Sequence, residues 1–263
     1  MKHTVSDVCA VLEKFAPLSL QEPYDNAGLI LGNREQLVTG ILIALDATLE
    51  VIDEAINLGY NLIVTHHPFI FKGLKTITGK NQTENCLIKA IRNDIAIYAG
   101  HTNVDSVRGG VNERMAVKLG LIDSSILVPL NQSACDCGLG MVGFLPESLS
   151  ETDFLLLVKK TFLCDRIRYS TLTGKVVRKV ALCGGSGSEF LENALSIGAD
   201  AYLTGEAKYH EFFTHASEIL LIDAGHYETE QFTKDIFFEI LSENFSTFAV
   251  RISVVETNPV HYL

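Results

Sequence analysis

The sequence has no long apolar run and no apolar leader. Its longest apolar stretches, such as residues 40–45, are far shorter than the roughly 20 residues that a membrane-spanning helix needs. The first seven residues turn polar before the core of a signal peptide could form. We therefore expect a cytoplasmic protein with no membrane partner.

The sequence also lacks any run of basic residues, and its net charge is −11. Surfaces that follow a nucleic-acid backbone cluster lysine and arginine to release counterions. We therefore do not expect nucleic acid as a partner. An acidic chain can still bind a phosphorylated small molecule when metal ions supply the positive charge.

Cysteines are few, and the six present do not reach the density of a secreted disulfide scaffold. Reduced thiols are therefore expected. Cys135 and Cys137 form the only close pair. With no second Cys or His pair nearby, buried or surface thiols are a better interpretation of this pair than a zinc site.

The patterns that are present alternate between strand and helix. Short apolar runs of the kind found in strands buried on both faces lie at residues 40–46, 61–65 and 95–99. Helical periodicity lies at residues 4–15, 49–58 and about 83–92. The second helix ends at Gly59, where glycine suits a helix cap.

The second half of the chain repeats this order. Residues 180–185 match 43–48, residues 194–204 match 55–65, and residues 220–226 match 95–101. In both copies a strand runs into Ala-Gly-His, and a carboxylate, Asp105 or Glu230, follows four residues after the histidine. Because order and strand-end chemistry agree, a duplicated unit is favoured over chance similarity of apolar segments.

This order predicts an α/β protein with mostly parallel sheets. We expect two related lobes, 1–124 and 125–263, with a helix at 151–163 and a final strand at 247–255 in the second. Ligands of parallel sheets bind beyond the carboxyl ends of the strands. The site is therefore expected in the cleft between the lobes.

Four of the eight histidines (His66, His67, His101 and His226) stand at or just past the ends of expected strands. Neutral imidazole and carboxylate are the ligands that borderline divalent metals prefer. A lone histidine or acid at such a place is more often structural or solvated. Paired histidines with two His-x-x-x-carboxylate units favour a metal site instead.

The spacing of these residues suits two ions. Adjacent side chains point in different directions in extended backbone, so His66 and His67 can serve different ions. His226 and Glu230 are four apart at the start of a helix expected over 227–241, which places them on one face. A carboxylate there can bridge both ions.

The motifs together resemble a known family. They lie in order along nearly the whole chain, at residues 24–32, 44–48, 65–68, 100–105, 109–112, 204–206 and 225–230. They are similar to those of the Nif-three-like dinuclear metal-centre proteins, often labelled GTP cyclohydrolase 1 type 2 homologues. One departure is Tyr24, where members commonly carry tryptophan.

The resemblance implies a ring-shaped homohexamer and a site for two divalent ions (zinc, iron, manganese or cobalt) that faces an inner cavity. Position by position, the implied metal ligands are His66, His67, Asp105, His226 and Glu230. His101 falls beside them, where we take it as a catalytic group that orients a ligand or passes protons.

Two ions about 3.5–4 Å apart can share a hydroxide and polarise a substrate oxygen, so hydrolysis is the natural chemistry. The label implies attack of metal-bound water on C8 of GTP. A phosphoesterase or another nucleotide hydrolase would use the same ligands. The alternative from another class is a metal-binding hexameric scaffold that stores or senses metal without turnover.

Three further segments have two interpretations each. The turn 184–188 can hold a phosphate on backbone N–H groups or be only a tight turn, and lacking a phosphate-loop pattern it favours the turn. Asp25 and Asn26 border the site or cap local structure. Glu206, Lys208 and His210 face the substrate or form a solvated helix start.

Overall fold

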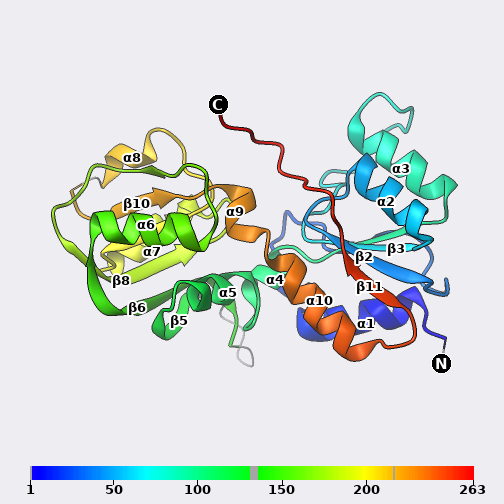
Figure 1. The fold of residues 1–263 in the computed structure, drawn as a ribbon, viewed down its shortest axis with the longest axis horizontal. Coiled ribbons are helices and arrows are strands. Elements are labelled where there is room, and N and C mark those ends of the chain that lie inside the picture. The colour runs from blue at the N-terminus through cyan, green and yellow to red at the C-terminus, as the bar shows by residue number, and fades with distance from the viewer. Residues whose placement is uncertain (1, 131–135, 216) are drawn as a thin grey trace. The chain divides into compact units, whose positions relative to one another are not determined.

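A computed structural model describes residues 2–130, 136–215 and 217–263 of the chain. It is an α/β protein with two mixed sheets (Figure 1). The chain divides into two compact units, the first formed by Met1–Val104 with Phe232–Pro259 and the second by Asp105–Gln231 with Val260–Leu263. This division differs from the expected 1–124 and 125–263, because the chain returns to the first unit near its end.

The first unit contains a five-stranded sheet in the order β1-β4-β3-β2-β11. Its strands are β1 (Gly28–Leu31), β2 (Gly40–Ala44), β3 (Leu62–Thr65), β4 (Ala96–Ala99) and β11 (Ala249–Ile252). Strands β11, β2, β3 and β4 are parallel, and only β1 at the edge is antiparallel. The central strands β2, β3 and β4 are buried along their whole length, as their continuous apolar runs predict.

Helices cover both faces of this sheet (Figure 1). They are α1 (Val5–Phe15), α2 (Leu49–Leu58), α3 (Gln82–Arg92) and α10 (Thr233–Asn244), with a 3-10 turn, η1, at Leu18–Leu20. Helix α1 packs on α10, and α2 packs on α3. Gly59 caps α2 in the left-handed conformation, with φ of 69°, which confirms the predicted helix end.

The second unit contains a six-stranded sheet in the order β5-β6-β8-β9-β10-β7. Its strands are β5 (Ile122–Pro129), β6 (Gly138–Ser150), β7 (Arg168–Tyr169), β8 (Val176–Cys183), β9 (Ala201–Thr204) and β10 (Leu220–Asp223). Only β8, β9 and β10 pair in parallel. The expectation of mostly parallel sheets is therefore wrong for this unit, since hairpin-type strands β5 and β6 extend it.

The helices of the second unit include the one expected at 151–163. They are α5 (Val111–Lys118), α6 (Glu151–Thr161), η2 (Ser188–Phe190), α7 (Leu191–Ser196), α8 (Glu211–Thr214) and α9 (His226–Glu230). The short α4 (Thr102–Ser106) lies at the division between the units. The single helix expected over 227–241 is wrong, because α9 ends at Glu230 and α10 begins at Thr233.

The last strand and one of the described cysteines also depart from expectation. β11 pairs with β2 in the first unit, not with the second sheet. Four cysteines (Cys9, Cys86, Cys164 and Cys183) are buried free thiols, whereas Cys137 is disulfide-bonded, against the expectation of reduced thiols. The alternative zinc pair includes Cys135, which lies outside the described residues. Among the described helices, none has the length and apolar character needed to cross a bilayer.

Candidate metal centre

His66 and His67 follow β3 directly, at the carboxyl edge of the first sheet. Their backbone N–H groups both donate to the carbonyl of Leu45, at 3.2 and 3.1 Å. The Thr65 hydroxyl donates to the carbonyl of His67 at 2.8 Å. These bonds fix the backbone of the pair beside the end of β2.

Each imidazole of this edge is held through its Nδ1 atom. His66 Nδ1 lies 2.8 Å from the Gly100 carbonyl, His67 Nδ1 lies 2.7 Å from Asp46 Oδ1, and His101 Nδ1 lies 2.8 Å from Asp25 Oδ1. Carbonyl and carboxylate oxygens only accept, so Nδ1 carries the proton in all three rings. In a neutral ring Nε2 is then the atom with the lone pair that a metal ion needs.

Asp46 is the acceptor that orients His67. It follows β2, and its second oxygen accepts from the Thr257 hydroxyl at 2.8 Å. Burial opposes ionisation of this carboxyl, but the hydrogen bond from His67 and the one from Thr257 outweigh it and lower its pKa. Asp46 therefore remains a carboxylate.

Asp25 plays the same part for His101. Its side chain is buried, and it also accepts from the Thr102 backbone N–H at 3.1 Å and from the Thr102 hydroxyl at 2.5 Å. Burial raises the pKa of Asp25, yet the hydrogen bond from His101 leads the interactions that bring it down to about 2. Both interpretations offered for Asp25 are supported, since it contacts His101 and also accepts from the N–H of Thr102 at the start of α4.

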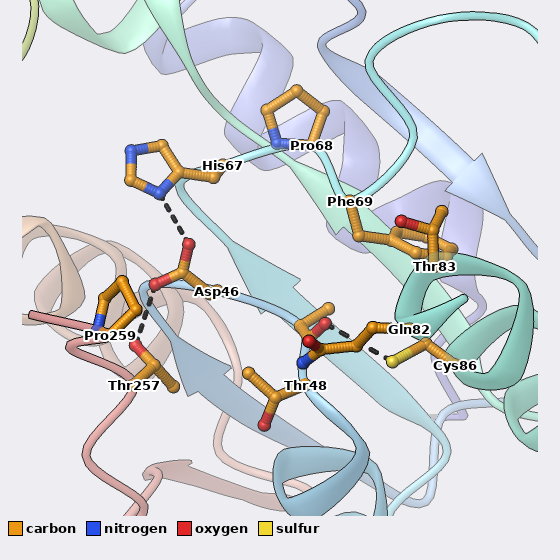
Figure 2. A pocket seen from close by; sticks show the side chains of 11 residues that line it. Asp46, Thr48, His67, Pro68, Phe69, Gln82, Thr83, Cys86, Thr257 and Pro259 are labelled. Atoms are coloured by element: carbon orange, nitrogen blue, oxygen red, sulfur yellow. Dashed lines mark hydrogen bonds and ion pairs between the residues drawn. The ribbon is translucent and has the colours of Figure 1, made fainter.

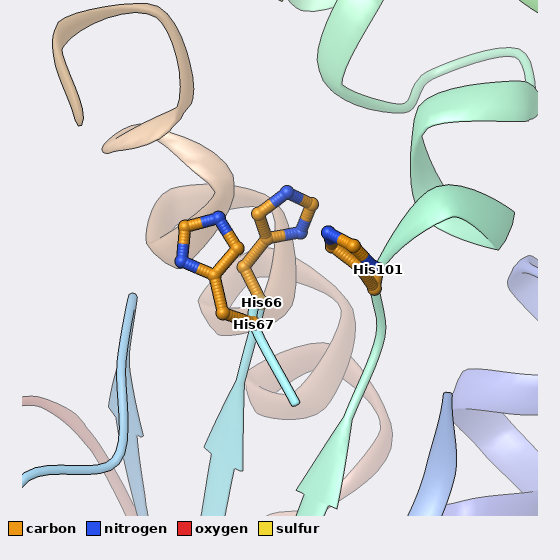
Figure 3. A group of neighbouring side chains, drawn as sticks. All are labelled: His66, His67 and His101. Carbon is orange, nitrogen blue, oxygen red and sulfur yellow. The ribbon is translucent and has the colours of Figure 1, made fainter. Parts of the chain in front are cut away.

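The three imidazoles form one cluster (Figure 3). The ring centroid of His66 lies 4.9 Å from that of His67 and 5.2 Å from that of His101. One nitrogen from each ring can be chosen so that all three lie within 4.8 Å of one another. Three imidazoles at this spacing, each with its tautomer fixed, form a donor set that suits a divalent metal.

The second unit brings together His226 and Glu230 on α9. His226 Nε2 lies 3.1 Å from Glu230 Oε2, as four-residue spacing in a helix predicts. His226 Nδ1 lies 3.4 Å from Glu206 Oε2. The Glu230 residue is buried, whereas the His226 side chain is 40% exposed. This pair repeats the imidazole and carboxylate chemistry of the first unit.

Glycines make room for this pair. A Cβ atom at Gly185 would lie 2.0 Å from Glu230 Oε1, and one at Gly205 would lie 2.9 Å from the Cα of His226. The N–H groups of Gly184 and Gly185 donate to Asn112 Oδ1 and Thr229 Oγ1, at 2.9 and 3.1 Å. Because these two donors are used internally, they are not available to a phosphate, which supports the favoured interpretation as a tight turn.

Asp105 belongs to the second unit and is linked to the same turn. Asn112 Nδ2 donates to the Asp105 carbonyl at 3.0 Å, and its Oδ1 accepts from Gly184. Burial, together with the charges of Asp105 and Glu230, raises the pKa of the Cys183 thiol at the end of β8. Both carboxylates therefore lie near the same strand end.

The structure thus assembles the predicted residues in two sets, His66, His67 and His101 in the first unit and Asp105, His226 and Glu230 in the second. Glu206 contacts His226, whereas Lys208 and His210 are exposed at the start of α8. The sequence reasoning missed Asp46 and Thr257. The position of Asp46 just after a buried strand was a signal that could have identified Asp46. No sequence signal identified Thr257, because it lies in a segment far away in the sequence.

An α/β protein that gathers imidazoles and carboxylates at strand ends belongs to the class of candidate metal proteins. The model of the family Duf34/NIF3 (NGG1p interacting factor 3) matches residues 3–259. The chain belongs to this family.

Curated relatives agree. A GTP cyclohydrolase 1 type 2 homolog of Clostridium acetobutylicum is 40% identical over 88% of this chain and 86% of its own length. One from Lactococcus lactis is 36% identical over 98% of both chains. Both relatives are named homologs of GTP cyclohydrolase 1 type 2. This name by itself does not assign an activity to this chain.

Solved structures share the fold. A hypothetical protein of Staphylococcus aureus superposes with a TM-score of 0.90, at 28% identity and full coverage of both chains. Reduced HcgD from Methanocaldococcus jannaschii superposes with a TM-score of 0.79, at 28% identity, covering 95% of this chain and 98% of that one. The fold of the whole chain is therefore that of its relatives.

Proposed function

We propose that His66, His67, Asp105, His226 and Glu230 together bind two divalent metal ions, and that the protein is a metal-dependent hydrolase. The observation that carries this proposal is the use of Nδ1 as donor in the strand-end imidazoles of His66 and His67. This arrangement presents Nε2 as ligand atom and is characteristic of metal-binding histidines. Mixed nitrogen and oxygen ligands suit zinc, iron, manganese and cobalt.

The proposed substrate is a nucleotide or a related phosphorylated small molecule, as for a GTP cyclohydrolase 1 type 2. The names of the curated relatives support this choice. A pair of bound ions would supply activated water and neutralise phosphate charge. The acidic chain, with its net charge of −11, depends on such ions to hold an anionic substrate.

The chain's own residues have distinct parts in this proposal. Asp46 holds the His67 ring in the orientation and tautomer that binding requires. Asp25 does the same for His101, and its carboxylate stabilises the imidazolium form that a proton transfer creates. We assign His101 the role of accepting a proton at Nε2 and returning it to the leaving group.

The test is turnover by the purified protein with its native metal, on nucleoside triphosphates and phosphodiesters. We expect metal-dependent hydrolysis that Asp105→Ala reduces at least a hundredfold and Glu243→Ala, which removes an exposed carboxylate, leaves intact. Equal background rates in all three proteins would contradict the hydrolase. If metal still bound stoichiometrically, the scaffold that stores or senses metal would take its place.

We further propose that the protein assembles as a homohexamer, which the motif resemblance supports. Light scattering at micromolar concentration should give six times the mass of one chain. A monomer or dimer under those conditions would refute the assembly without affecting the ligand assignment.

A further inference from the structure

A pocket of about 270 Å³ lies in the first unit beside His67 (Figure 2). Its lining comes from the ends of β2 and β3, the start of α3 and the segment 257–259. This volume is below the roughly 300–1,000 Å³ of pockets that enclose drug-sized ligands. The pocket therefore fits one ring system and not a whole nucleotide.

Part of the pocket wall is apolar. Pro68, Phe69 and Pro259 supply rings, and Cys86 closes one side with a buried thiol (Figure 2). Aromatic and proline rings pack well against the face of a planar ligand, and stacking tolerates any base. The shape and chemistry of these walls favour a planar ligand.

Most of the polar side chains in the pocket lining carry no charge. Gln82 and Thr83 contribute amide and hydroxyl groups that donate and accept, whereas the Thr48 hydroxyl already accepts from the N–H of Val51 at the start of α2. No lysine or arginine lines the pocket among the described residues, so a phosphate would find no countercharge here. Donor and acceptor groups without charge are suited to the edge of a heterocyclic base.

Asp46 is the one charged group in the lining among the residues that the structure describes, and it is already engaged. One oxygen accepts from His67 and the other from Thr257, at 2.7 and 2.8 Å (Figure 2). The carboxylate therefore serves to connect the pocket wall to a proposed metal ligand. A ring bound here would lie next to the group that orients His67.

We propose that this pocket binds the purine base of the substrate, while the metal ions hold its reactive or phosphorylated part. The inference rests on the proposed function and names the substrate class of the same site. Base binding in the pocket can be measured without turnover. The pocket proposal and the hydrolase proposal can therefore be refuted independently of each other.

The chain contains no tryptophan, which permits a single reporter. In Phe69→Trp the indole forms part of the pocket wall, and in the control Phe213→Trp it lies on the exposed surface of the second unit. The probes are guanosine, which has a base but no phosphate, and ribose 5-phosphate, which has the reverse. We expect guanosine to quench the fluorescence of Phe69→Trp saturably and to leave that of Phe213→Trp unchanged, with no saturable response to ribose 5-phosphate.

A second variant tests the polar edge. Gln82→Ala in the reporter background should weaken guanosine binding about tenfold, the effect of one lost hydrogen bond in a partly enclosed site. Asn85→Ala, which removes an exposed amide one turn along α3 and outside the pocket lining, should leave it unchanged. Saturable quenching by ribose 5-phosphate, or none by guanosine, would overturn the pocket assignment even if hydrolysis were found.

Discussion

At the scale of single residues, the site depends on side chains that hold other side chains. Thr257 donates to Asp46, Asp46 accepts from His67, and His67 presents Nε2. A ring held in one tautomer and one orientation binds metal without the entropy cost of ordering. In the proposed metal centre, residues that do not contact an ion would therefore influence its affinity.

Asp46→Asn should lower metal affinity by about 10–100-fold, the usual effect of losing a group that orients a metal-bound histidine. Asp53→Asn is the matched control, since its carboxylate is exposed and contacts Lys89. Metal titration followed by calorimetry measures both. Unchanged affinity in Asp46→Asn would show that His67 needs no such orientation.

Gly185→Ala separates ligand geometry from backbone strain. The new Cβ would displace the Glu230 carboxylate, 2.0 Å away, and the residue would also be strained at φ of 57°. Gly174→Ala carries similar strain, at φ of 75°, with no atom within 4 Å of the added Cβ. Both should lose about 1–2 kcal/mol of unfolding free energy, but only Gly185→Ala should lose metal. Full metal occupancy in both would exclude Glu230 as a ligand.

At the scale of elements, the sequence pattern predicted well the parallel strands of the two sheets and the helices between those strands. The apolar runs at β2, β3 and β4 are unambiguous because both faces of these strands are buried. The break between α9 and α10 was not predictable from periodicity, because the chain changes unit there while its polar and apolar residues continue in helical order.

The strand register of the two repeated segments could not be predicted from the sequence either. The Ala-Gly-His segments align Gly100 with Gly225 by sequence. In the sheets, however, it is the N–H of Gly100 that donates to Thr65 and the N–H of Ala224 that donates to Thr204, both at 2.9 Å. The two histidines are therefore offset by one residue in the ladders. Such an offset depends on how neighbouring strands pair, and matching sequence motifs do not determine that pairing.

The start of α3, which lines the proposed base pocket, is held by Glu84. This carboxylate accepts from the backbone N–H groups of Thr78 and Lys80, at 2.8 and 3.2 Å, and from the side chain of Asn81 at 3.1 Å. Glu84→Ala should lower the Tm by a few degrees, because four donors lose their acceptor, the fourth being the Thr78 hydroxyl at 3.1 Å. Glu84→Gln should lower it less.

Hydrogen exchange of residues 78–92 localises the effect of Glu84→Ala, since faster exchange there and not in α1 is expected. Uniform exchange across the first unit would mean that Glu84 supports the whole core and not this segment.

At the scale of the molecule, the chain passes between units at three points, after Val104, after Gln231 and after Pro259. Asp105 and Glu230 stand within one residue of the first two points. The histidines at strand ends were predictable from one unit's pattern alone, whereas the proposed ligand set draws on both units and depends on how the chain is divided. For this reason the ligand types were readable in the sequence, and the supporting residues were not.

Removal of metal should destabilise the whole protein. A ligand that binds only the folded state adds about 2.7 kcal/mol at a concentration 100 times its dissociation constant. Melting curves before and after chelation, with metal added back, should therefore show a reversible fall in Tm. Identical curves for the chelated and the metal-loaded protein would contradict metal binding by the folded chain.

The most direct test of the account is anomalous diffraction from crystals grown with the native metal. It should show two peaks per chain, each within about 2.0–2.3 Å of an imidazole nitrogen or carboxylate oxygen of His66, His67, Asp105, His226 or Glu230. The absence of any peak, or peaks held by other residues while these five bind none, would contradict the proposed two-metal site.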